Sequence, residues 1–372
     1  MNVCLDVQAA IAQRAGVGRY VRQLAEHLAA LSDRDTLTLF YFDFKRHGAP
    51  PAAPGARLRS VRWLPGRWVQ QAWKRFGFPP FEWFAGDADL YHFPNFVLPP
   101  LSRRRRAVVT VHDMAFMRYP EFAEDRNRRY LEARIRDTVR RAGAILTDSR
   151  FSAAEIHDIL KVPADRIHAI PLGVDPSFGP VPAERIRAVR ERQGLQRPYL
   201  LTVSTIEPRK NLTFMGDVYD RLLSYDGDLV LAGMPGWKWE PIVAHLRGLH
   251  RGERVRFLRY VADEDLPALY AGADLFLCTS HYEGFGLPPL EAMACGTPVV
   301  SSPGGSLAEV LGDAALLVPR FDLEAWADAV VRVLSDRALR DRLTAAGRLR
   351  AAGYRWEDTA RQTWAAYRSV AA

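Results

Sequence analysis

The chain has 372 residues, of which 48% are hydrophobic and 25% are charged. That composition is typical of a soluble globular protein, and the length exceeds what one core usually serves, so we expect two domains. We find neither an apolar run of the ~18 residues that span a bilayer nor a signal-peptide pattern, which favours a cytoplasmic protein. The three cysteines have no metal-ligand spacing, and we expect them to fill the core in a reducing compartment.

The positive charge is unevenly distributed. Residues 1–180 hold 27 Lys and Arg against 19 Asp and Glu, whereas residues 181–372 hold 24 of each. The excess of +8 therefore lies in the first half, where a large anionic partner is expected. Nucleic acid, a membrane surface and a lipid diphosphate all fit this charge.

Short apolar runs alternate with amphipathic stretches, which predicts parallel α/β sheets. The first six predicted strands are Asn2–Val7, Leu37–Tyr41, Leu90–Phe93, Ala107–Val111, Ala144–Thr147 and Ile167–Ile170. After the turn-rich segment 176–182, six more follow at Tyr199–Ser204, Asp228–Ala232, Val255–Leu258, Leu275–Thr279, Pro298–Ser301 and Ala315–Val318. Helices are expected at Leu323–Leu334, Asp336–Ala352 and Trp356–Val370.

This order of elements predicts two Rossmann-like, doubly wound α/β domains that face each other across a cleft. We place the first domain at residues 1–180 and the second at residues 181–354. The last segment, 355–372, is expected to pack back on the first domain. Ligands of such sheets bind beyond the carboxyl ends of the strands.

Two motifs follow predicted strands of the first half. Gly16 and Gly18 open a helix in the segment AGVGRY, where glycines let a backbone approach an anion, although a plain tight turn is an equal reading. His112 and Asp113 directly follow the strand Ala107–Val111. An imidazole at that place can bond a sugar hydroxyl or assist proton transfer, while the alternative is a structural His beside a turn-capping Asp.

Two adjacent cations, Arg209 and Lys210, follow the first strand of the second half in the segment EPRKN. Arginine can grip two phosphate oxygens and lysine adds a point charge, so the pair suits a diphosphate. The alternative is a solvated helix start. However, cations are disfavoured at a helix N-terminus, which favours an anionic partner.

The most informative stretch is EGFGLPPLE, residues 283–291. Gly284 and Gly286 predict a sharp loop, after which Glu291 lies early in a helix whose dipole keeps its carboxylate ionised. A carboxylate has two acceptor oxygens and complements a vicinal diol. Glu283 lies on the loop itself, so the two acids are expected to serve different parts of one ligand.

Together these motifs resemble the retaining family-4 (group 1) glycosyltransferases of GT-B architecture, and the resemblance covers nearly the whole chain. It implies that Glu291 binds the nucleotide ribose, that Glu283 and His112 contact the transferred sugar, and that Arg209 and Lys210 neutralise the diphosphate. The frequent Gly-Arg pair of the family is missing, because Val203 and Ser204 stand there.

The resemblance also assigns the remaining site residues. The catalytic set comprises His112, Glu283, Arg209 and Lys210. The donor-binding set comprises Gly16, Gly18, Ser204, Glu207, Arg209, Lys210, Tyr260, Val261, Glu283, Gly284, Phe285, Gly286, Leu287 and Glu291. The acceptor-side candidates are His112, Asp113 and Arg19.

Within the family the chain is similar to bacterial mannosyltransferases of O-antigen or exopolysaccharide synthesis. The implied donor is GDP-mannose or a GDP-deoxymannose such as GDP-rhamnose. The implied acceptor is a glycan or a polyprenyl-diphosphate-linked glycan, and no nucleic acid is expected. A sugar-nucleotide epimerase, a pyridoxal-dependent phosphorylase-like enzyme and a non-enzymatic basic protein that binds membrane or nucleic acid are the alternatives.

Neither a cofactor nor a metal is expected. Asp-x-Asp triplets, which could serve a metal-dependent transferase, lie beside turns or ahead of helices, where Asp is common anyway. They are Asp33/Asp35, Asp87/Asp89, Asp226/Asp228 and Asp263/Asp265.

A tryptophan-rich basic stretch, Arg59–Phe84, and the run Arg103–Arg106 suit an anionic bilayer surface. Peripheral association with the inner face of the membrane is one reading. A core-packed irregular helix with a solvated basic loop is the other.

Overall fold

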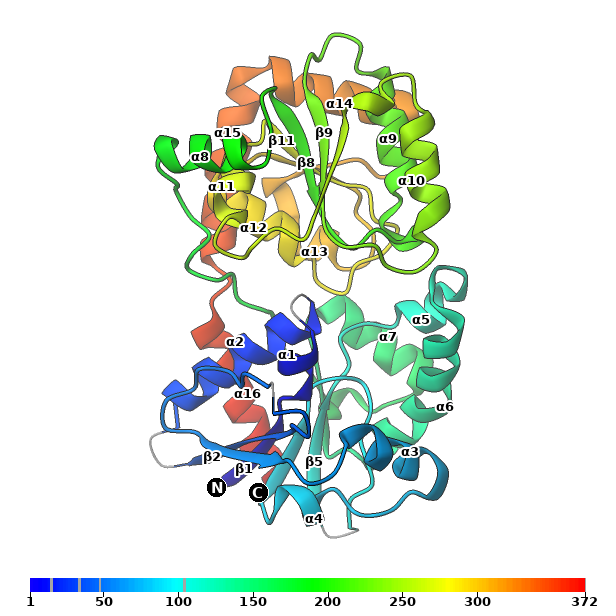
Figure 1. The fold of residues 1–372 in the computed structure, drawn as a ribbon, viewed down its shortest axis with the longest axis vertical. Helices are drawn as coiled ribbons and strands as arrows, with labels where there is room; N and C mark the ends of the chain where they lie inside the picture. Colours follow the sequence, from blue (N-terminus) through cyan, green and yellow to red (C-terminus); the bar gives the residue numbers. More distant parts are fainter. Residues whose placement is uncertain (14–15, 33–34, 47, 103–104, 372) are drawn as a thin grey trace. The chain divides into compact units, whose positions relative to one another are not determined.

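The computed structural model describes all residues except 14–15, 33–34, 47, 103–104 and 372. It divides into two compact units. The first contains residues 1–114, 126–173 and the C-terminal helix, and the second contains residues 115–125 and 174–355. Each unit is built around its own parallel sheet (Figure 1).

The first sheet has seven strands in the order β3-β2-β1-β4-β5-β6-β7. They are β1 (Asn2–Asp6), β2 (Thr36–Phe42), β3 (Arg57–Val61), β4 (Leu90–Phe93), β5 (Arg106–Thr110), β6 (Ala144–Thr147) and β7 (Ile167–Ala169). Its helices are α1 (Gln8–Ala12), α2 (Val17–Ala30), α3 (Gly66–Phe76), α4 (Glu82–Ala85), α6 (Asp125–Arg141), α7 (Arg150–Leu160) and α16 (Trp356–Ala371). Because the order reverses between β1 and β4, their carboxyl ends form a topological switch point.

The second sheet has six strands in the order β10-β9-β8-β11-β12-β13. They are β8 (Tyr199–Val203), β9 (Asp228–Ala232), β10 (Val255–Arg259), β11 (Leu275–Cys278), β12 (Val299–Ser301) and β13 (Leu316–Leu317). Its helices are α8 (Ala183–Arg192), α9 (Leu212–Arg221), α10 (Trp239–Gly248), α11 (Leu266–Ala271), α12 (Leu287–Cys295), α13 (Leu307–Leu311), α14 (Leu323–Ser335) and α15 (Arg337–Ala352). Helix α5 (Ala115–Arg118) also belongs to this unit. Here the switch point lies between β8 and β11.

Burial explains why these apolar runs become strands. Strands β4, β6, β9 and β11 are buried along their whole length, as expected for a parallel sheet with helices on both faces. The core of the second unit joins strand residues such as Leu200 and Leu277 to Trp326 and Val330 of α14. Cys4, Cys278 and Cys295 are buried free thiols.

The C-terminal helix α16 returns to the first unit and packs on α2 and β5. The indole of Trp364 donates a hydrogen bond to the carbonyl of Leu28 at 3.1 Å. The hydroxyl of Tyr367 lies 2.6 Å from Nδ1 of His92, so the helix is joined to the sheet by polar bonds as well as by apolar contact.

Among the strands of the described residues, β3 is the one that the sequence did not predict. Its sequence, RLRSV, contains two arginines and a serine, four of its five residues are not buried, and it forms an edge of the sheet. The tryptophan-rich stretch that follows forms α3 and α4 rather than one irregular helix. Trp63, Trp68 and Trp83 are exposed in this stretch, and only Trp73 turns inward, where its indole donates to the carbonyl of Pro79 at 2.7 Å.

Candidate active site

The second unit gathers charged side chains at the switch point between β8 and β11. The β8 loop carries Glu207, Arg209 and Lys210, the last two in a short 3-10 turn that ends at left-handed Asn211 (φ 53°). The β11 loop carries Glu283. The two loops are tied together by the amide of His281, which donates to the carbonyl of Arg209 at 2.9 Å.

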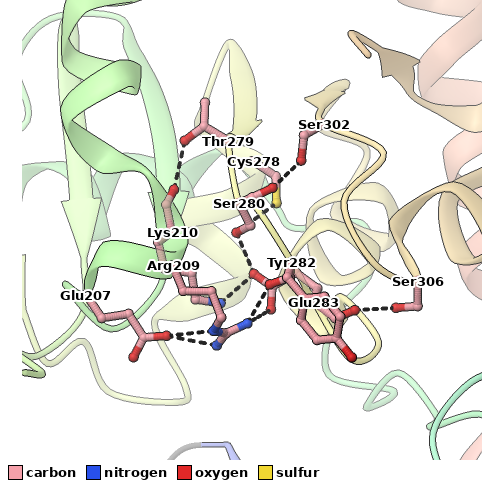
Figure 2. A network of polar contacts seen from close by, with 10 residues as sticks. All are labelled: Glu207, Arg209, Lys210, Cys278, Thr279, Ser280, Tyr282, Glu283, Ser302 and Ser306. Carbon is pink, nitrogen blue, oxygen red and sulfur yellow. Dashed lines mark hydrogen bonds and ion pairs between the residues drawn. The ribbon is translucent and has the colours of Figure 1, made fainter. Parts of the chain in front are cut away.

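Both cations converge on one carboxylate (Figure 2). Lys210 Nζ lies 2.6 Å from Glu283 Oε1, and Arg209 Nη1 lies 2.8 Å from Oε2. Ser280 adds a hydroxyl donor at 2.5 Å from Oε1, while Glu207 accepts from the other side of the Arg209 guanidinium at 2.8 Å. All four ionic side chains are largely buried. The cluster is thus a prearranged set of donors that holds an anion.

The charge state of Glu283 follows from this environment. Burial alone would raise the pKa of its carboxyl, but Lys210 and Arg209 outweigh burial and lower that pKa to about 2. Glu283 is therefore ionised at every physiological pH.

The backbone around Glu283 is fixed by close packing against the loop before α13. The hydroxyl of Ser306 donates to the Glu283 carbonyl at 3.0 Å. A Cβ atom on Gly305, whose φ is +67°, would lie 2.3 Å from the same carbonyl. Glycine is required there because any side chain would push the Glu283 loop away.

A small cavity adjoins the cluster at the carboxyl ends of β8 and β11. It is lined by Ser204, Lys210, Glu283 and Gly286, with Pro288 of α12. The hydroxyl of Ser204 is buried and has no hydrogen-bond partner among the described residues. Buried polar atoms in proteins usually have a hydrogen-bond partner, and this hydroxyl lines the same cavity as Lys210 and Glu283.

Glu291 lies apart from the ionic cluster, on helix α12. Its carboxylate is buried and accepts a hydrogen bond from the hydroxyl of Tyr270 at 2.9 Å. Pro288 and Pro289 occupy the first turn of this helix, which begins at Leu287 after left-handed Gly286 (φ +98°).

Other donor-side candidates occupy neighbouring positions at the same edge of the sheet. Tyr260 and Val261 directly follow β10, with Tyr260 exposed and Val261 buried. Phe285 is buried and its ring lies edge-on to Tyr354, with centroids 5.5 Å apart, so its side chain has a packing role. Gly284 completes the turn before α12.

The first unit holds the other candidates at the carboxyl ends of its strands. His112 follows β5 and is buried, with Nδ1 2.9 Å from Asp148 Oδ2 and Nε2 3.1 Å from the carbonyl of Pro94. Asp113 and Arg19 are partly buried. The sequence analysis did not select Asp148, although it follows β6 directly, which is the same signal that selected His112.

The glycine loop shows two different local reasons for its glycines. Gly16 has φ +58° and is exposed, whereas Gly18 lies inside α2, where a Cβ atom would come within 2.0 Å of the Gln13 carbonyl. Close packing therefore explains Gly18. Ala15 of this loop, Asp33 of one Asp-x-Asp triplet, and Arg103 and Arg104 of the basic run lie outside the described residues.

Within the part of the chain that the structure describes, no three His, Cys, Asp or Glu side chains come together as a metal-binding group. The same residues contain no helix with the length and apolar character needed to cross a membrane.

Two doubly wound sheets, one with a cation cluster at its switch point, define the GT-B class of glycosyltransferases. Residues 14–178 match the family described as Glycosyltransferase Family 4, and residues 185–350 match Glycosyl transferases group 1. The chain is 35% identical to O-antigen chain mannosyltransferase B of Escherichia coli, over 95% of this chain and 96% of that protein. It belongs to the family-4, group 1 glycosyltransferases.

Two further similarities agree with this assignment. The serotype-specific mannosyltransferase WbdA of Escherichia coli is 30% identical over 75% of this chain, which spans only 35% of that longer protein. Sucrose-phosphate synthase from Thermosynechococcus elongatus has the same fold, with a TM-score of 0.79 at 24% identity, over 99% of this chain and 98% of that one. Neither the epimerase nor the non-enzymatic binding protein is favoured by these findings.

Proposed function

We propose that this glycosyltransferase moves mannose, or a deoxymannose, from a GDP-sugar onto a lipid-linked or oligosaccharide acceptor in bacterial surface polysaccharide synthesis. The observation that carries the proposal is the convergence of Arg209 and Lys210 at the β8–β11 switch point. The 35% identity to an O-antigen mannosyltransferase supports the choice of sugar.

The cation cluster supplies the chemistry that departure of a nucleoside diphosphate needs. Developing negative charge on the leaving phosphate is stabilised by fixed positive groups that require little reorganisation. Glu283 forms ion pairs with these groups. We infer that the diphosphate takes over part of their hydrogen bonding, while the Glu283 carboxylate turns to the hydroxyls of the sugar.

The remaining residues bind different parts of the sugar donor. Glu291 accepts from the ribose diol, and the unpartnered Ser204 hydroxyl bonds the phosphate end of the ligand. Transfer proceeds without a metal and retains the anomeric configuration. These assignments rest on the family resemblance together with the position of each residue around the β8 and β11 ends.

The first test is a thermal-shift screen of the intact protein with GDP, UDP, ADP and dTDP. A ligand that binds only the native state raises the melting temperature, so GDP should give the largest increase. Transfer is then measured with GDP-mannose and, as the matched control, UDP-glucose. A larger shift with UDP, or transfer from UDP-glucose alone, would refute the GDP-sugar proposal.

We further propose that the first unit binds an anionic membrane surface peripherally. Trp63, Trp68, Trp83, Phe76 and Phe78 are all more than half exposed on and around α3 and α4. Arg62 beside them is 54% exposed. Exposed aromatic rings with cations suit a lipid headgroup region, and a lipid-linked acceptor would be found there.

A further inference from the structure

The first unit contains a buried ion pair in addition to the cation cluster of the second unit. Strands β5 and β6 are parallel neighbours, and Val109 is in register with Ile145. His112 and Asp148 follow these strands, so both side chains emerge at the same edge of the sheet. Their contact of 2.9 Å joins Nδ1 of the imidazole to Oδ2 of the carboxylate.

Both ring nitrogens of His112 face hydrogen-bond acceptors. Nδ1 faces the Asp148 carboxylate, and Nε2 lies 3.1 Å from the carbonyl of Pro94. A backbone carbonyl can only accept, and an ionised carboxylate can only accept, so each ring nitrogen must carry a hydrogen. The imidazole is therefore a doubly donating cation and has no lone pair with which to take up a proton.

The groups packed around His112 are consistent with a cation. Burial lowers the pKa of the imidazole, but Asp148, the Pro94 carbonyl and Asp113 together outweigh burial, and the net pKa is raised. Burial also raises the pKa of Asp148, against the opposing charge of His112. His92, on β4, stays neutral because burial and the nearby His112 lower its pKa to about 3. Tyr20, on α2, sets its ring edge-on to His112, with centroids 4.9 Å apart, while its hydroxyl lies 3.2 Å from Thr110 Oγ1.

We propose that Asp148 is a positioning residue of the transfer reaction, which holds His112 as a charged hydrogen-bond donor and prevents it from acting as a base. This rests on the proposed function and on the contact between His112 and the transferred sugar that the family resemblance implies. A sugar or phosphate oxygen can replace the Pro94 carbonyl at Nε2 without any change in protonation. The proton of the acceptor hydroxyl then goes to the departing diphosphate, whose oxygen gains the electron pair of the broken glycosidic bond.

The direct test needs no sugar donor. The full chain is labelled with ¹⁵N-histidine, and ring nitrogen shifts are followed from pH 5 to pH 9, with His112→Asn identifying the resonance. Wild-type His112 should show two protonated nitrogens at pH 7. Asp148→Asn should lower the pKa of His112 by about one to three pH units, the usual effect of an adjacent opposite charge.

The chain offers a matched control in His245, whose Nε2 lies 2.6 Å from Asp217 but whose ring is exposed. Asp217→Asn should leave the His112 titration unchanged. Asp148→Ser is measured in parallel with Asp148→Asn, because a change in packing specific to one variant could itself alter the titration of His112. A neutral His112 ring at pH 7 in the wild type, or a titration indifferent to both Asp148 variants, would overturn the proposal.

A second arm measures transfer from GDP-mannose to a lipid-linked glycan extract. Asp148→Asn should lower kcat on the order of 10- to 100-fold and leave KM for GDP-mannose nearly unchanged. This loss of kcat is no larger than the loss caused by removing a hydrogen-bond donor that touches the reacting atoms. Asp148→Glu should restore part of kcat. A changed titration with unchanged kcat would disprove the positioning role. A wild-type protein inactive with GDP-mannose would contradict the proposed function instead, and the NMR arm would still decide the charge of His112.

Discussion

The ammonium of Lys210 lies 2.6 Å from the carboxylate of Glu283, although 73 residues separate them in the chain. One comes from the loop after β8 and the other from the loop after β11. Because these strands are neighbours at the point where the strand order reverses, the sheet brings the loops together. An internal carboxylate thus pairs with the cations that we assign to the donor diphosphate.

The two glutamates should respond differently to replacement by alanine. Glu291→Ala should weaken GDP binding by roughly 1.5–3 kcal/mol, the scale of a hydrogen bond to a charged group. Glu283→Ala should bind GDP about as well as the wild type, because free GDP lacks the sugar and the substitution releases Arg209 and Lys210. Its transfer activity should collapse. Calorimetry with GDP and turnover with GDP-mannose measure the two effects.

Tyr270→Phe serves as the control, because it removes only the hydroxyl that Glu291 accepts. It should lose less GDP affinity than Glu291→Ala. Equal losses of GDP affinity in Glu283→Ala and Glu291→Ala would contradict the division of roles, as would unfolding of both variants.

The ionised state of Glu283 should stabilise the fold in a defined pH range. A carboxyl whose pKa falls from 4.5 to about 2 on folding stabilises the protein above pH 4.5, by on the order of 3 kcal/mol. That contribution declines as the pH falls from 4.5 toward 2. Urea unfolding of the wild type and Glu283→Gln should therefore differ most at pH 6–8 and converge in acid. A stability difference that stayed constant from pH 7 to pH 3 would show that the ion pair is not its source.

A methyl group at Gly305 should damage the site selectively. Gly305→Ala combines a left-handed backbone with a Cβ atom 2.3 Å from the Glu283 carbonyl, so transfer should fall along with stability. Gly55 has a similar backbone (φ +87°) with no atom within 4 Å of its Cβ position. Gly55→Ala should cost about 1 kcal/mol and leave transfer intact. If transfer survived in Gly305→Ala, the Glu283 loop would not depend on this packing.

Transfer should not require a metal ion. The positive charge at the donor diphosphate is supplied by Arg209 and Lys210, so activity should survive excess EDTA in metal-free buffer. The assay compares initial rates with and without chelator, then adds manganese or magnesium. Activity that EDTA abolished and manganese restored would show that a metal carries this charge.

Membrane binding should depend on the exposed tryptophans and on ionic strength. The wild type should sediment with vesicles rich in phosphatidylglycerol and be released by salt, because exposed charges are screened. Replacing Trp63, Trp68 and Trp83 by Ser should reduce sedimentation. Replacement of Leu223 and Leu349, which are 81% and 79% exposed on the second unit, should have no effect. Equal loss in both variants, or binding indifferent to salt, would refute the proposed surface.

The strands that were predicted best from the sequence are almost wholly apolar, because they are buried in the sheet. Leu90–Phe93, Ala144–Thr147 and Asp228–Ala232 have the bounds expected from their apolar runs. Strand β3 was not predicted because an edge strand needs no continuous apolar run. It is held mainly by backbone pairing with β2. Asp148 was missed for a different reason, because an Asp before a helix is more often a cap than a partner of a histidine 36 residues away.

The sequence by itself determined the fold class, the family and the positions where the chemistry lies. These follow from local patterns. The spacing of apolar residues, the glycine loops and the charged residues after strands can each be recognised within a short stretch of sequence. Only the tertiary structure decided which side chains contact each other. That Glu283 binds Lys210 and Arg209, that Glu291 instead meets Tyr270, and that Asp148 faces His112 all depend on which strands are neighbours. Strand order is set by long-range packing, and no local pattern in the chain encodes it.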